Sequence, residues 1–174
     1  MASVYISYRR NDAAGTVGRL HDHLTQALGT ENVFIDIDAS PADPSSEIRD
    51  TLSRVDAVLV VIGPHWLEAR RGTQRALDDT GDLVRQEIAA ALTAKKWVIP
   101  VLVDGARCPR VEDLPWDIPE LAQRHAIELS HQDWARDVTL LVGSVKYIAP
   151  SRPEPQISTS APSPSPLPTP THAP

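Results

Sequence analysis

Glu87 is the residue whose type and surroundings most clearly suggest chemistry. It lies in a stretch with a helical pattern, and its neighbours three and four positions away on a helix are all apolar. The carboxylate therefore has no salt-bridge partner on its own helix. It either lies at the edge of the apolar face and reaches solvent, or is held in a partly dry crevice that tunes it for chemistry. These neighbours are Leu83, Val84, Ala90 and Ala91.

Tyr8, Arg9 and Arg10 follow the first apolar run of the chain. Guanidinium groups make charge-assisted and often bidentate hydrogen bonds to phosphate. At the mouth of a crevice, two adjacent arginines would suit a ligand that carries phosphates. The alternative is that both are solvated surface charges.

The sequence lacks the residue patterns of other common nucleotide-binding, phosphoacceptor, metal-binding and hydrolytic sites. No GxGxxG follows the first apolar run, and no GxxxxGK[ST] occurs. A phosphoacceptor receiver domain needs carboxylates where this chain has arginines. The histidines do not join Cys108 in a metal-ligand spacing, and no Ser/His/Asp or Cys/His arrangement is readable. We therefore expect no metal and no bound cofactor.

The elements that must position these residues alternate between short β-rich runs and amphipathic stretches. Asp82 is expected to cap the helix that carries Glu87, and Pro100 predicts a bulge or an interruption in the fourth strand. This alternation of strands and helices along the chain predicts an α/β fold. Helices would cover both faces of a five-stranded parallel sheet with the strand order 2-1-3-4-5. Strands are expected at 3–8, 33–37, 58–62, 97–103 and 126–129, and helices at 16–28, 47–54, 82–94 and from 133.

In such a sheet, ligands bind beyond the carboxyl ends of the strands where the strand order reverses, between strands 1 and 3. Three segments meet there: residues 8–12 after strand 1, residues 63–66 after strand 3, and the helix that carries Glu87. The sequence therefore predicts a site that brings Glu87 and the two arginines together.

Charge and composition limit the partners. The net charge of −6 disfavours nonspecific binding to nucleic acid or to an anionic membrane surface. Cys108 is the only cysteine, the chain opens without a long apolar run, and residues 57–63 are too few to span a bilayer. We expect a cytoplasmic protein.

Composition changes abruptly near residue 149. From residue 150 to residue 174, 9 of the 25 residues are proline, and most others are Ser, Thr and Ala. Such a segment buries too little apolar surface to offset its ordering entropy. The sequence thus predicts a folded domain at 1–149 and a disordered Pro/Ser-rich linker or tail at 150–174, which can lead into another module or end freely.

Several motifs resemble those of the Toll/interleukin-1 receptor (TIR) domain family, especially its bacterial members. VYISYRRND resembles the first signature box, NVFIDID and the following Pro/Ser-rich loop resemble strand B and the BB loop, and DLVRQEIAAAL with VIPVLVDG resembles the catalytic helix and strand D. The resemblance covers about residues 3 to 148 and implies the flavodoxin-like TIR fold.

Many TIR domains are NAD+ glycohydrolases, in which one glutamate promotes cleavage of the bond between nicotinamide and ribose. The resemblance assigns that role to Glu87, with NAD+ as substrate. It implies that Tyr8, Arg9 and Arg10 line the NAD+ cleft. It also implies that Asp36 and Asp38 border the BB loop that gates the cleft.

Leu83 departs from the family pattern, because many NAD-cleaving members carry an aromatic residue four positions before the glutamate. A leucine can form a wall of the cleft but offers no aromatic face for stacking. Trp66 could supply that face from the loop after strand 3, or it could be a core or lid residue.

Two functions follow from the resemblance. The first is an NAD+-consuming effector of bacterial immune or signalling systems, switched on when self-association opens the BB loop, with ADP-ribose or a cyclic form as product. The second is a noncatalytic module that signals through TIR-TIR contacts, joined by its Pro-rich tail to a further module. Transfer of a base or ribose among nucleotides is a third, weaker possibility and would need the same glutamate.

Overall fold

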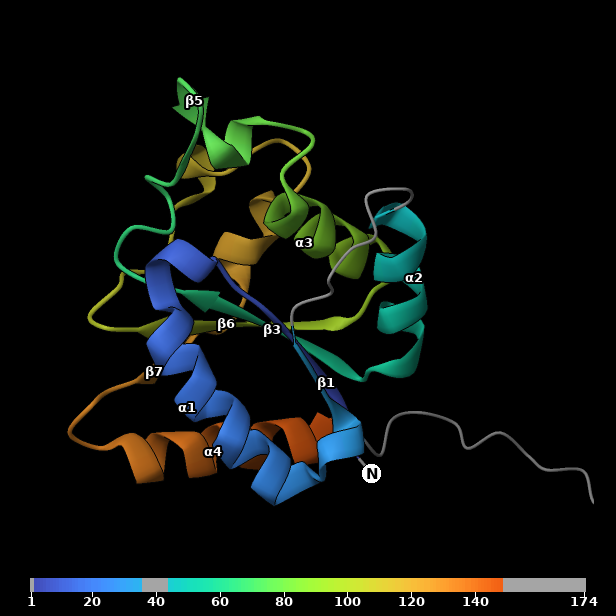
Figure 1. Ribbon diagram of the computed structural model, residues 1–174, viewed down its shortest axis with the longest axis vertical. Helices are drawn as coiled ribbons and strands as arrows, with labels where there is room; N and C mark the ends of the chain where they lie inside the picture. The colour runs from blue at the N-terminus through green and yellow to red at the C-terminus, as the bar shows by residue number, and fades with distance from the viewer. Residues whose placement is uncertain (1, 36–43, 149–174) are drawn as a thin grey trace, which may run out of the picture.

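A five-stranded parallel sheet forms the centre of the computed structural model, which describes residues 2–35 and 44–148 (Figure 1). The sheet has the order β2-β1-β3-β6-β7, in which β4 and β5 are missing because they form a separate hairpin. This is the predicted order 2-1-3-4-5, and every neighbouring pair is parallel. The strands are β1 (Val4–Ser7), β2 (Val33–Ile35), β3 (Ala57–Ile62), β6 (Trp97–Val103) and β7 (Ile127–Leu129).

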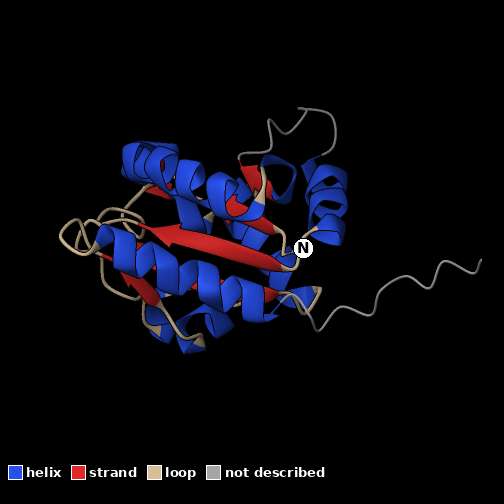
Figure 2. Ribbon diagram, turned by 90° about the horizontal axis from the view of Figure 1, so that it is seen from below, coloured by secondary structure: helices blue, strands red, loops and turns tan. Residues whose placement is uncertain are grey.

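Helices cover both faces of the sheet, as predicted. Helices α1 (Arg10–Leu28) and α4 (Trp134–Ile148) pack on the face seen from below in Figure 2, and α2 (Pro44–Arg54) and α3 (Leu83–Thr93) pack on the other. Alternate residues of each strand enter opposite apolar cores, because successive side chains of a strand point to opposite faces. Ile6 joins the core under α1 and α4, whereas the neighbouring Tyr5 joins the core under α2 and α3.

Two predictions about single elements are wrong. Strand β6 runs without a break through Pro100, which pairs with Val60 of β3. On its other side β6 pairs with β7 only from Val101 onward, so the missing N–H of Pro100 removes no bond from that ladder. Helix α1 begins at Arg10, well before the expected residue 16, with a kink at Ala13, where φ is −134°.

The polar stretch after β3 is more ordered than predicted. It forms an antiparallel hairpin, β4 (Arg70–Arg71) and β5 (Gln74–Arg75), joined by a two-residue turn. Gly72 has a φ of +64° in this turn, a conformation that favours glycine. Short 3-10 helices complete the chain: η1 (Thr30–Asn32), η2 (Ala76–Asp78), η3 (Val111–Asp113) and η4 (Pro119–Gln123).

Two features of the remaining chain complete the description. No helix of the described residues is long and apolar enough to cross a membrane. The predicted tail at 150–174 lies outside the described residues.

Candidate active site

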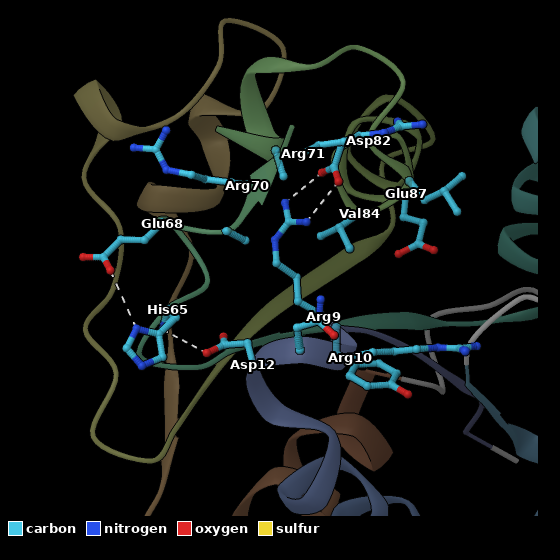
Figure 3. Close-up of a pocket in the computed structure, with 15 residues that line it drawn as sticks. Arg9, Arg10, Asp12, His65, Glu68, Arg70, Arg71, Asp82, Val84 and Glu87 are labelled. Carbon is cyan, nitrogen blue, oxygen red and sulfur yellow. Dashed lines mark hydrogen bonds and ion pairs between the residues drawn. The ribbon is translucent and has the colours of Figure 1, made fainter. Parts of the chain in front are cut away.

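A cleft of about 550 Å³ opens at the carboxyl ends of β1 and β3, where the strand order reverses (Figure 3). The start of α1, the loop after β3, the β4-β5 hairpin and the first turns of α3 form its walls. This is the position that the strand order predicts. The lining residues are Tyr8, Arg9, Arg10, Asn11, Asp12, His65, Glu68, Ala69, Arg70, Arg71, Ala76, Asp82, Leu83, Val84 and Glu87.

Glu87 forms part of the inner wall of the cleft and is only 8% exposed. The hydroxyl of Tyr5 donates to its Oε1 at 2.7 Å, and the hydroxyl of Ser7 donates to its Oε2 at 2.5 Å. Of the two arrangements left open by the sequence, the structure gives the partly dry crevice.

The two residues that hold Glu87 come from β1 and were missed at the sequence level. Tyr5 and Ser7 are two positions apart, so their side chains leave the strand on the same face. Both are at most 2% exposed. The period of two shows that these hydroxyls share a face, but no local pattern shows that Glu87, 80 residues later, packs against them.

Arg9 lies at the centre of the cleft in a bidentate ion pair with Asp82 (Figure 3). Its Nη1 donates to Oδ1 at 3.0 Å and its Nη2 donates to Oδ2 at 2.8 Å. Asp82 also accepts the backbone N–H of Arg85 and so caps α3, as predicted. The pair therefore joins the end of β1 to the start of the helix that carries Glu87.

Trp66 supports this ion pair from the core side. The guanidinium carbon of Arg9 lies 5.6 Å from the centre of the indole ring, a cation-π geometry. Trp66 is fully buried and is absent from the cleft wall. Of the positions considered for Trp66 from the sequence, the structure shows the core position. Its aromatic face contacts Arg9 and does not face the cleft.

Asp12 ties the start of α1 to the loop after β3. Its Oδ1 accepts the backbone N–H of His65 at 2.8 Å. This contact requires glycine at position 63, because a Cβ there would lie 2.5 Å from Oδ2 of Asp12. The two loops that border the cleft are therefore fixed to each other.

The remaining predicted site residues fall into two groups. Tyr8, Arg10 and Leu83 all line the cleft with Glu87, and Leu83 is 40% exposed there. Asp36 and Asp38 lie outside the described residues. The binding roles of all these residues stay predictions.

The outer wall of the cleft is the β4-β5 hairpin. Two of its arginines, Arg70 and Arg71, line the cleft, and the sequence did not single them out. Arg71 donates to Oδ2 of Asp79 at 3.1 Å and to the carbonyl of Gly81 at 3.0 Å. Arg70 donates to the carbonyl of Thr73, within the hairpin turn, at 3.0 Å.

The base of the hairpin carries a further ion pair. Arg75 binds both carboxylate oxygens of Asp78, at 3.1 and 2.7 Å, and this hydrogen bonding holds the pKa of Asp78 below its ordinary value. Arg75 also donates to the carbonyl of Asp113 at 2.7 Å. These bonds connect the hairpin to the loop between β6 and β7.

Taken together, the cleft offers a buried carboxylate at one end and guanidinium groups along its length. An inner carboxylate can stabilise positive charge that develops on a bound substrate, and guanidinium groups can bind anions. No cluster of three potential metal-ligating side chains occurs among residues 2–35 and 44–148.

Comparisons with known proteins give the same picture for the fold. A family model described as TIR domain matches residues 4–142. The chain is 28% identical over 131 residues to an NAD(+) hydrolase, sarm1, of Drosophila melanogaster and 29% identical over 130 residues to NAD(+) hydrolase SARM1 of Danio rerio. Each alignment covers 74% of this chain but only 9% and 17%, respectively, of the relative.

Two solved structures resemble the fold. The TIR domains of the activated Roq1 resistosome superpose with a TM-score of 0.59 at 13% identity, covering 83% of this chain and 99% of that chain. The TIR domain of the Toll-related receptor TRR-2 from Hydra magnipapillata superposes with a TM-score of 0.53 at 15% identity, covering 84% and 99%.

Proposed function

The chain belongs to the TIR domain family, and from this premise we propose that it is an NAD+ glycohydrolase in which Glu87 carries the chemistry. It would cleave the bond between nicotinamide and ribose to give nicotinamide and ADP-ribose or a cyclic form. The observation that carries the proposal is the Glu87 carboxylate, held by two hydroxyls in the wall of a cleft. The similarity to two NAD(+) hydrolases supports the choice of substrate.

The chemistry requires little besides a positioned carboxylate. Nicotinamide leaves as a neutral group with the electron pair of the broken bond, and the ribose passes through an oxocarbenium-like state. A carboxylate next to that carbon stabilises the positive charge as it develops. Water then adds to the same carbon and loses a proton, or an adenine nitrogen adds and gives the cyclic form.

The hydroxyls of Tyr5 and Ser7 would serve this step by holding the Glu87 carboxylate in one orientation. Two donors from one strand also fix both oxygens, so the carboxylate has few rotamers left. Little reorganisation is then needed when charge appears on the ribose.

Self-association is proposed as the switch, and a cytoplasmic role in bacterial immunity or signalling as the setting. Large apolar side chains available for contact between copies stand out from the surface: Trp116 is 84% exposed, Tyr147 86% and Trp97 52%. We therefore expect activity to rise with protein concentration or with artificial clustering.

The test is to incubate the purified protein, clustered or at high concentration, with NAD+ and to follow nicotinamide release. Release by the parent and its loss in a folded Glu87→Ala variant are expected. Equal release by both proteins would remove Glu87 from the reaction. No release under any clustering condition would favour the noncatalytic TIR-TIR signalling module.

A further inference from the structure

We propose that Arg70, on the β4-β5 hairpin, is the residue that binds the phosphates of the substrate, so that the cleft selects a phosphate-bearing dinucleotide over a bare nucleoside. The inference rests on the proposed function and extends it from the scissile bond to substrate selection. Arg70 and Glu87 line one cleft, and in Figure 3 the Arg9-Asp82 pair lies between them. An extended ligand with its ribose at Glu87 would reach the hairpin.

The charge of Arg70 is the first argument. The structure gives this side chain a single interaction, with the carbonyl of Thr73, and no carboxylate partner among the described residues. By contrast, Asp82 neutralises Arg9, and Asp79 binds Arg71. Of these three arginines, Arg70 alone has no carboxylate partner among the described residues, so no ion pair compensates its charge. In Figure 3 its guanidinium points away from the Arg9-Asp82 pair, so the side chain must turn to meet an anion in the cleft.

The pairing of Arg9 is the second argument. A bidentate contact to phosphate needs two N–H groups on one edge of a guanidinium. Both terminal nitrogens of Arg9 already donate to Asp82, and both side chains are about nine-tenths buried. The remaining Nε of Arg9 has no hydrogen-bond partner but is itself buried, so the side edge of the guanidinium is closed to a ligand. Arg9 could bind a phosphate through its terminal edge only by leaving a buried carboxylate without its partner, which is costly.

The free donors of Arg70 are the third argument. Only its Nη1 is used, by the carbonyl of Thr73 at 3.0 Å, so Nη2 and Nε keep N–H groups for a ligand. The side chain is exposed and can turn over the cleft mouth without breaking a buried contact.

The hairpin beneath Arg70 is anchored, which limits the entropy lost when a ligand binds. The N–H of Ala76 donates to the carbonyl of Ala69 at 2.7 Å and closes the base of the hairpin. Arg71 holds the hairpin to Asp79, and Leu77, just beyond it, is fully buried. The backbone of Arg70 is thus fixed while its side chain stays available.

The first experiment measures binding of ADP-ribose by calorimetry. Because charge-assisted hydrogen bonds contribute more than neutral ones, Arg70→Ala should weaken binding about tenfold, and Arg70→Lys should weaken it less. Arg49→Ala is the matched control, because Arg49 is an exposed arginine outside the cleft that also bonds a main-chain carbonyl. It should bind within about twofold of the parent.

The second experiment compares cleavage of NAD+ with cleavage of nicotinamide riboside, which has the same scissile bond and no phosphate. Arg70→Ala should lower kcat/KM for NAD+ about tenfold and leave that for nicotinamide riboside unchanged. An equal loss for both substrates would overturn the inference.

Binding of ADP-ribose separates this inference from the proposed function. Failure to cleave NAD+, with binding that still depends on Arg70, would overturn only the function. The assignment of Arg70 fails if Arg70→Ala binds ADP-ribose like the parent, if Arg49→Ala loses as much, or if the parent does not bind ADP-ribose.

Discussion

The two ends of the cleft are built in different ways. At the inner end, Glu87 is 8% exposed and both of its oxygens accept hydroxyls from β1. At the outer end, Arg70 is exposed on a hairpin and bonds only a carbonyl of its own turn. A fixed, buried group suits bond cleavage, and an exposed cation suits capture of an anion. Substitutions at the inner end should therefore change kcat or the fold, and those at the outer end should change binding.

The largest expected effect separates Glu87 from Glu68, two of the four carboxylates that line the cleft. Glu87→Gln should lower kcat for NAD+ about 10³-fold, because an amide keeps the shape but cannot stabilise a developing positive charge. Glu68→Gln is the control, since Glu68 lines the same cleft with a side chain that is 79% exposed. Steady-state nicotinamide release measures both variants. A similar loss of kcat in both variants would show that the buried inner carboxylate has no special role in bond cleavage.

The next effect compares how much Arg9 and Arg70 each contribute to the stability of the fold. Arg9→Ala should lower the free energy of unfolding by about 3 kcal/mol, because it leaves the buried carboxylate of Asp82 unpaired. Arg70→Ala should change it by less than about 0.5 kcal/mol, as is usual for an exposed side chain. Urea unfolding measures both. Equal changes would show that the ion pair does not hold the inner end together.

A smaller effect concerns the hydroxyls that hold Glu87. Tyr5→Phe should lower kcat about tenfold with KM within about twofold, because one charge-assisted hydrogen bond is lost while the buried ring stays in place. Ser53→Ala removes a hydroxyl from an exposed residue outside the cleft and should have no effect. A change confined to KM in Tyr5→Phe would count against a positioning role.

The smallest effect concerns the base of the hairpin. Hydrogen bonds from Arg75 lower the pKa of Asp78, so this carboxylate stabilises the fold above its unfolded-state pKa. That stability is lost as pH falls through the lower pKa of the folded state. Asp78→Asn should therefore be slightly less stable than the parent at about pH 7, and the difference should vanish at about pH 2. Urea midpoints at both pH values measure it, and a difference that persists in acid would contradict the pairing.

Much of the fold could be predicted from the sequence because its signals are local. Buried strands such as residues 57–62 are continuous apolar runs, and Asp82 stands at a helix start where a capping side chain is favoured. The hairpin was missed because arginine and glutamine stand at its strand positions, which apolar and β-branched residues usually fill. Only the Gly72-Thr73 turn signalled it.

The site could be predicted only in part, because its contacts join distant segments. Helical spacing identified Glu87 as a carboxylate among apolar neighbours, and the strand order located it beside a crevice. Its bonds to Tyr5 and Ser7 span 82 and 80 residues, and the bond from Arg9 to Asp82 spans 73. No periodicity within a single element encodes such pairs.

The most direct test of the central claim, that a carboxylate held by β1 cleaves NAD+, is a double-mutant cycle between Tyr5 and Glu87. Nicotinamide release would be measured in single turnovers, with clustered protein in excess over NAD+. Tyr5→Phe is predicted to slow release about tenfold in the parent and to have no further effect in Glu87→Gln, because the hydroxyl acts through that carboxylate. The same tenfold loss in both backgrounds would contradict the account.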